Sequence, residues 1–132
     1  MSLAASLSYA RSRAPEPSTV DALVARLRDH LGSDRVSVEE ADRRVASSDY
    51  AFLSPVLIEA LPTSLADVVA YPRSLDELTA AVEVATALDV PIVPRGKGTG
   101  NYGQAVPLAG GLVIDVSGMD SVLELGDGWV RA

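Results

Sequence analysis

The sequence predicts a fold that mixes α and β structure, of the α/β or α+β class, in which a small mixed sheet with a βαβ unit is flanked by helices. Three observations predict it: an amphipathic segment at residues 18–31, a strand–helix–strand pattern at 68–94, and short apolar runs separated by glycines after residue 111. The 132 residues are 48% hydrophobic and 22% charged, which suits one packed domain and not a disordered chain.

The first predicted element is a helix that follows a proline-containing tail. We expect residues 1–17 to be a flexible tail and residues 18–132 to form one domain. Ser18 opens a Ser-x-x-Asp pattern that is typical of a helix N-terminus. Apolar residues then recur on one helical face: Val20, Leu23, Val24, Leu27 and Leu31. Gly32 follows where a helix C-cap is expected.

The stretch between residues 33 and 66 carries weaker signals. Residues 36–38 predict a short strand, and the polar residues 39–48 suit either a helix or a loop. Two prolines in residues 49–62 indicate irregular backbone.

A βαβ unit is predicted next. The apolar run 68–71, ended by Pro72, indicates a buried strand, and residues 90–94 indicate a second one. Between them, Ser74 and Glu77 form a capping box at the start of a helix. The expected core face of this helix consists of Leu78, Ala81, Val82, Ala85 and Leu88. A helical connection of this length predicts that the two strands are parallel.

The last third of the chain predicts three more strands. Residues 112–116 form an apolar strand, and residues 122–125 and 129–131 form a hairpin that turns at 126–128. Because the chain stops at Ala132, within a predicted strand, we expect a truncated domain.

Composition and charge exclude several classes of function. The net charge of −7 disfavours nucleic acid and anionic membranes as partners. The absence of cysteine excludes disulfides and thiolate metal sites, and a single histidine, His30, excludes a multi-histidine site, so no metal is expected. No apolar run reaches the ~20 residues of a membrane span. A chain without cysteine fits a reducing compartment, and we expect a cytoplasmic location.

A glycine-rich segment is the strongest candidate for chemistry. Four of the ten glycines fall within residues 96–103, where they free the backbone to point successive N–H groups at an anion. No acidic residue lies between Asp89 and Asp115, whereas Arg95 and Lys97, the only lysine, lie within that window. This pattern favours phosphate binding, with a plain turn between strands as the alternative.

Two well-known phosphate motifs do not fit this segment. Residues 98–103 match G-x-G-x-x-G, but Pro107 and Gly110 arrive too soon for the long helix that a Rossmann fold requires. A P-loop is excluded because Lys97 is followed by glycine and not by serine or threonine.

Residues 66–130 resemble the first half of the PCMH-type FAD-binding domain of the vanillyl-alcohol oxidase and p-cresol methylhydroxylase superfamily. The branch that looks most similar contains the FAD-linked D-lactate dehydrogenases and glycolate oxidase subunits. The matching features are residues 71–74, 90–96, 98–100, Gly103, Pro107 and residues 111–119.

The resemblance implies a flavin-dependent oxidoreductase that oxidises a 2-hydroxy acid or a related alcohol. It implies that FAD is lined by Arg95, Gly96, Lys97, Gly98, Thr99, Gly100, Asn101, Tyr102 and Gln104. Lys97 and Thr99 stand where some branches carry a flavin-linking histidine, so no covalent link to FAD is expected from this loop. Gln104 departs from the glycine common in this branch.

The resemblance places the substrate domain and half of the cofactor's walls outside this chain. We therefore expect these 132 residues to be inactive alone and to bind FAD weakly. A non-redox module that binds phosphate or a nucleotide is the alternative function.

Five further residues carry weaker expectations. His30 is expected to complement the dipole of the first helix and not to act in catalysis. Asp115 is expected to make a structural hydrogen bond or to lie exposed at a strand end. Asp49 and Tyr50 are secondary candidates for approaching the cofactor, and Trp129 is expected to pack in a small core.

Overall fold

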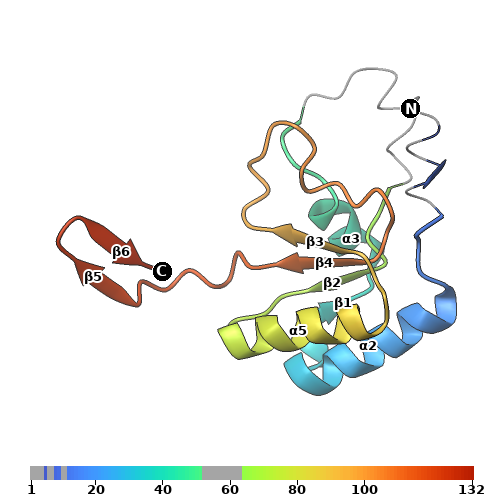
Figure 1. Ribbon diagram of the computed structural model, residues 1–132, viewed down its shortest axis with the longest axis horizontal. Coiled ribbons are helices and arrows are strands. Elements are labelled where there is room, and N and C mark those ends of the chain that lie inside the picture. Colours follow the sequence, from blue (N-terminus) through green and yellow to red (C-terminus); the bar gives the residue numbers. More distant parts are fainter. Residues whose placement is uncertain (1–4, 6–7, 10–11, 52–63) are drawn as a thin grey trace.

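The computed structural model in Figure 1 describes residue 5, residues 8–9, residues 12–51 and residues 64–132. Its helical elements are α2 (Pro17–Leu31), the 3-10 turn η1 (Ser33–Arg35), α3 (Glu40–Ala46) and α5 (Leu75–Ala87). Its strands are β1 (Val36–Ser37), β2 (Val68–Ala70), β3 (Ile92–Arg95), β4 (Leu112–Asp115), β5 (Glu124–Gly126) and β6 (Trp129–Arg131). The prediction of irregular backbone for residues 49–62 falls almost wholly on residues 52–63, outside the described part.

The main sheet has four strands in the order β1-β2-β4-β3. β1 is antiparallel to β2, whereas β2, β4 and β3 run parallel. The predicted βαβ unit therefore has parallel strands, but β4 lies between them, with Val113 paired to Val69 on one side and to Val93 on the other. β4 suits this central place because Leu112, Val113 and Ile114 are apolar on both faces of the strand, and all four of its residues are buried there.

Helices α2 and α5 cover one face of this sheet, and α3 lies against the other (Figure 1). The larger core lies on the α2–α5 face, where Leu23, Leu27 and Leu31 pack against the sheet. The smaller one, on the α3 face, consists of Ala46, Ala66, Val69 and Val113, with Tyr71 and Val93 against it. The polar segment 39–48, ambiguous in sequence, contains the helix α3.

The predicted core face of α5 is wrong at one position. Val82 is 39% exposed, and Val84 is buried in its place. Ala81, Val84 and Ala85 follow the i, i+3, i+4 spacing of one helical face, while Val82 lies about a quarter turn away.

The two predicted helix caps have different outcomes. α2 begins at Pro17 with Glu16 as N-cap, and the cap predicted at Ser18 does not form. Proline suits the first helical position because its φ is already helical and it has no N–H to leave unpaired. Ser74 caps α5 as predicted, its Oγ accepting from the Glu77 N–H at 3.2 Å, while the Glu77 carboxylate accepts from the Arg73 N–H at 2.8 Å.

The β5–β6 hairpin projects away from the rest of the fold (Figure 1). It forms where it was predicted, but every residue from 121 to 132 is exposed. The small core expected around Trp129 is therefore wrong. Trp129 is 49% exposed, and its ring lies over the Gly126 backbone, with the Arg131 guanidinium 6.0 Å from the ring centroid.

Candidate functional site

The glycine-rich loop, residues 96–111, connects β3 to β4 without a helix. It passes over the face of the sheet that α3 covers (Figure 1), and the Tyr50 N–H donates to the Gly100 carbonyl at 2.9 Å. At its start, the Arg95 carbonyl accepts from the Val116 N–H at 2.8 Å, and at its end the Gly111 N–H donates to Asp67 Oδ2 at 2.7 Å. The loop is thus fixed at both ends and in its middle.

The main-chain N–H groups at the beginning of this loop have no acceptors. Among the described residues, none of the six N–H groups from residue 96 to residue 101 donates a hydrogen bond. Pairing resumes at Tyr102, whose N–H donates to Gln104 Oε1 at 3.1 Å. A run of free N–H groups in irregular backbone is the arrangement that binds anions in proteins.

Residues 96–100 of this run line a cavity of about 220 Å³. Its lining includes seven of the nine residues predicted to contact a cofactor: Arg95, Gly96, Lys97, Gly98, Thr99, Gly100 and Gln104. Asn101 and Tyr102 are not part of it, and Tyr102 is 88% exposed. Pockets that enclose a whole small ligand measure roughly 300–1,000 Å³, so this cavity suits a part of a larger ligand.

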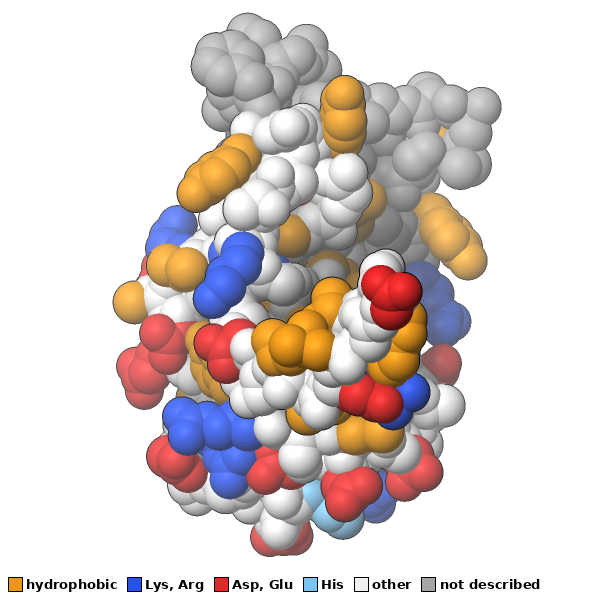
Figure 2. All heavy atoms as spheres, turned by 90° about the vertical axis from the view of Figure 1, so that its left-hand side faces the viewer, with side chains coloured by type: hydrophobic (Ala, Val, Ile, Leu, Met, Phe, Trp, Pro, Cys, Tyr) orange, Lys and Arg blue, Asp and Glu red, His pale blue; other side chains and the backbone are white. Residues whose placement is uncertain are grey.

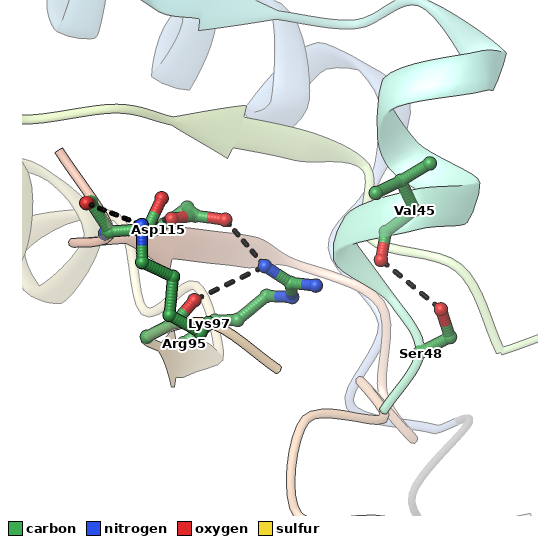
Figure 3. Close-up of polar contacts among 7 residues, drawn as sticks. Val45, Ser48, Arg95, Lys97 and Asp115 are labelled. Atoms are coloured by element: carbon green, nitrogen blue, oxygen red, sulfur yellow. Dashed lines mark hydrogen bonds and ion pairs between the residues drawn. The ribbon is translucent and has the colours of Figure 1, made fainter. Parts of the chain in front are cut away.

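Arg95 is committed to a structural ion pair (Figure 3). Its Nη1 lies 2.7 Å from Asp115 Oδ2, and the two side chains are only 12% and 7% exposed. Asp115 Oδ1 also accepts from the Ser117 N–H at 2.9 Å. The structural hydrogen bond predicted for Asp115 is confirmed, and its exposure at a strand end is not. The pair joins the ends of β3 and β4, and Asp115 neutralises the charge of Arg95.

Gly98 packs directly on that arginine. Its φ of +66° is unfavourable for other residues, and a Cβ built on it would lie 2.3 Å from Arg95 Nη2. A side chain at position 98 would therefore strain the backbone and displace the Arg95 guanidinium.

Lys97 supplies the cation that the loop still offers to a ligand. Its Nζ makes one long contact of 3.4 Å with the Ser117 carbonyl, and the residue is exposed (Figure 3). No acidic side chain of the described part of the chain pairs with it.

Asp49 brings an acidic group into this site from a distant part of the sequence. The segment 90–114 contains no acid, yet Asp49, three residues after α3, lines the same cavity. Asp49 thus lies at the cavity, and its approach to a cofactor stays a prediction. Tyr50 contributes its main chain and is 74% exposed. The sequence held no spacing signal that ties residue 49 to the loop.

Tyr71 follows β2 and is influenced by the ion pair next to it. Burial raises the pKa of its hydroxyl, and the charges of Asp42 and Asp115 raise it further, with Arg95 opposing them.

Other sites find no support in the described residues. His30 lies in the last turn of α2, on the other face of the sheet from the loop. No group of three or more His, Asp or Glu side chains in ranges 12–51 and 64–132 is arranged to hold a metal ion. No helix among the residues described combines the length and apolarity needed to cross a bilayer.

Comparison with known sequences gives consistent matches. The family described as FAD binding domain matches residues 66–132. Glycolate oxidase subunit GlcD of Bacillus subtilis is 40% identical over 62 residues, which are 47% of this chain and 13% of that protein. The probable mitochondrial D-lactate dehydrogenase of Danio rerio is 31% identical over 108 residues, 82% of this chain and 20% of that protein. The chain thus spans a fifth or less of the length of these relatives.

Comparison with solved structures gives the same fold. A crystal structure of p-cresol methylhydroxylase with bound substrate superposes with a TM-score of 0.69 at 15% identity. The match covers 85% of this chain and 21% of that protein. The small mixed sheet with its flanking helices therefore has the fold of the corresponding part of that protein.

Proposed function

Because the chain belongs to the FAD binding domain family, we propose that the beginning of its glycine-rich loop, residues 96–104, holds the diphosphate of FAD. The observation that supports this is the run of free N–H groups from 96 to 101, of which residues 96–100 line an open cavity, together with the exposed ammonium of Lys97. N–H groups and a cation are the donors that phosphate oxygens require.

The residues present fit the diphosphate and not the whole cofactor. The cavity of about 220 Å³ accommodates a part of FAD, in agreement with the weak binding that we predict for these 132 residues. Bound FAD would supply the redox chemistry, while this chain binds and orients its phosphates. The described residues that line this cavity include no histidine, cysteine or tyrosine, so binding through it is proposed to be non-covalent.

For the whole protein we propose a flavin-dependent oxidoreductase whose small-molecule substrate is a 2-hydroxy acid or a related alcohol. The names of the glycolate oxidase and D-lactate dehydrogenase relatives support this substrate class. A cytoplasmic location and the absence of a nucleic acid partner, both suggested by composition, belong to the same proposal.

Gly98→Val tests the proposed cofactor loop. The substitution places a side chain on the Arg95 guanidinium at a positive φ, so we expect FAD affinity to fall at least about 30-fold. NMR titration of the 132-residue chain with FAD measures it, since that method detects weak binding.

Gly128→Val is the matched control, because Gly128 also has a positive φ, +77°, but lies in the hairpin turn with no neighbouring atom within 4 Å of its Cβ position. It should leave FAD affinity within about twofold, as no cofactor contact is proposed there. Equal affinities of the wild-type chain for FAD, ADP and inorganic diphosphate would favour the non-redox module. If the Gly98→Val variant bound FAD as tightly as the wild type, the proposal that this loop holds the diphosphate would be wrong.

A further inference from the structure

Two buried polar side-chain atoms of the described residues have no hydrogen-bond partner, and both belong to residues that line the cavity. They are Asp49 Oδ2 and Arg95 Nε. Buried polar atoms are nearly always paired in proteins, because an unpaired one costs roughly 1–3 kcal/mol. Because both residues line one cavity, we consider a ligand in that cavity as the missing partner of both atoms.

Asp49 is held in place by the main chain around it. Its Oδ1 accepts from the Ala51 N–H at 2.8 Å, and the neighbouring Tyr50 N–H donates to the Gly100 carbonyl at 2.9 Å. Asp49 Oδ2 lies 3.2 Å from the point that a Cβ on Gly100 would occupy. The carboxylate is therefore fixed beside the loop whose N–H groups are free.

The two unpaired atoms have opposite hydrogen-bonding character. Arg95 Nε is a donor, and an ionised carboxylate such as Asp49 only accepts. A phosphate oxygen suits the donor but is repelled by Asp49, whereas a hydroxyl group suits Asp49. A ligand that carries a hydroxyl next to its phosphate satisfies both atoms.

We propose that Asp49 is a specificity-determining residue whose Oδ2 accepts a hydrogen bond from a sugar or polyol hydroxyl flanking the diphosphate. FAD carries such hydroxyls on its ribose and its ribityl chain, and inorganic diphosphate has none. Asp49 thus admits the dinucleotide and disfavours the bare anion. This inference rests on the proposed function, since it places FAD in this cavity.

Asp49→Asn tests the inference in the 132-residue chain. Removing the negative charge should raise the affinity for inorganic diphosphate about fivefold, whereas FAD also loses a charge-assisted hydrogen bond and should bind no tighter than before. The ratio of the dissociation constants, diphosphate over FAD, is expected to fall at least about fivefold. NMR titrations with FAD and with sodium diphosphate measure both constants.

Asp29→Asn is the control, because Asp29 is exposed on α2 and the substitution changes the net charge equally. It should leave the ratio unchanged. If Asp49→Asn does not fold, Asp49→Ser repeats the test, since a serine hydroxyl can still accept from the Ala51 N–H.

The outcomes separate this inference from the proposed function. If Asp49→Asn strengthens FAD and diphosphate binding by one common factor, or changes neither, Asp49 does not recognise a hydroxyl and the inference is wrong, while the FAD loop stands. If FAD binds equally well to the Gly98→Val variant, the proposed function itself fails.

Discussion

Two connections link the parallel strands of this sheet, and they differ in structure and in the face of the sheet that they cross. The connection from β2 to β3 contains the 13-residue helix α5, and the connection from β3 to β4 is the 16-residue glycine-rich loop. α5 packs on one face of the sheet, and the loop crosses the other (Figure 1). A helix pairs its own N–H groups, whereas this loop leaves six of them without an acceptor among the described residues.

The loop depends on groups outside itself for its shape. The Arg95–Asp115 pair, Asp67 and the main chain of Tyr50 fix it at three places. α5 is stabilised by its cap at Ser74 and by burial of its apolar face. The difference implies that stability and ligand binding can be changed separately in the two connections.

Figure 2 views the fold from the side on which the hairpin projects, and it shows charged side chains of both signs spread over the lower part of this surface. The net charge of −7 is thus not gathered into a single acidic patch on this face. Binding at the loop is therefore expected to depend on local groups such as Lys97 and Asp49 more than on the overall charge.

The largest expected effect comes from breaking the ion pair at the base of the loop. Arg95→Met leaves Asp115 charged, nearly buried and without its partner, so the free energy of unfolding should fall by about 3 kcal/mol. Urea denaturation followed by circular dichroism measures it. The double variant Arg95→Met/Asp115→Leu removes both charges and should recover most of the loss.

An exposed ion pair serves as the control that shows whether burial determines the contribution of the Arg95 pair to stability. Arg44 pairs with Glu40 on α3 at 2.6 Å, but the side chains are 62% and 67% exposed. Arg44→Met should change the stability by less than about 0.5 kcal/mol. A loss as large as that of Arg95→Met would show that burial is not what makes the Arg95 pair important.

The next effect concerns ligand binding and not stability. Lys97→Gln removes the exposed cation of the loop, and FAD affinity should fall about tenfold at low salt. The difference from wild type should shrink as salt is raised, because screening weakens the contribution of an exposed charge. Titrations at two salt concentrations measure this, with Arg26→Gln on the exposed side of α2 as the control. An equal loss in both variants would mean that only net charge matters.

In the helical connection, a substitution should lower stability and leave ligand binding unchanged. Ser74→Ala removes the cap of α5 and should lower the free energy of unfolding by about 1 kcal/mol. FAD affinity should stay within about twofold of wild type, because α5 lies on the face opposite to the loop. Urea denaturation and an FAD titration of the same sample measure both. A loss of affinity as large as that of Lys97→Gln would mean that the two connections are coupled.

The same contrast explains what could be predicted from the sequence. The helical connection could be predicted from local patterns. Ser74 indicates where the helix begins, and the spacing of apolar residues indicates its buried face, except that Val84 is buried where Val82 was predicted. The glycines and the charge window located the loop, and seven of the nine residues expected to contact the cofactor do line the cavity. Their contact with FAD stays a prediction.

Long-range features could not be predicted in this way. The insertion of β4 between β2 and β3 depends on which strand can be buried on both faces. Strand order is therefore set by the assembled sheet and not by the sequence of any one strand. The pairing of Arg95 with Asp115, 20 residues apart in sequence, and the approach of Asp49 to Gly100 follow from that arrangement. The expected core around Trp129 was wrong because no described residue buries the hairpin.

The smallest expected effect is a pH dependence on the loop side of the sheet. The raised pKa of Tyr71, caused first by burial and then by Asp42 and Asp115, means that folding favours its neutral form. The contribution is complete below the unfolded pKa of about 10 and is lost as the pH rises through the higher folded pKa. Stability of the wild-type chain should therefore fall more steeply above pH 10 than that of Tyr71→Phe.

Urea denaturation between pH 8 and about pH 11, around the ordinary tyrosine pKa, measures both slopes. Tyr102→Phe is the control, because the Tyr102 side chain is 88% exposed, and its stability should follow the wild-type curve throughout. Parallel curves for wild type and Tyr71→Phe would contradict a raised pKa of Tyr71 in the folded chain. A steeper fall in the wild type would show that burial, together with the charges of Asp42 and Asp115, favours the neutral Tyr71 hydroxyl at the end of β2.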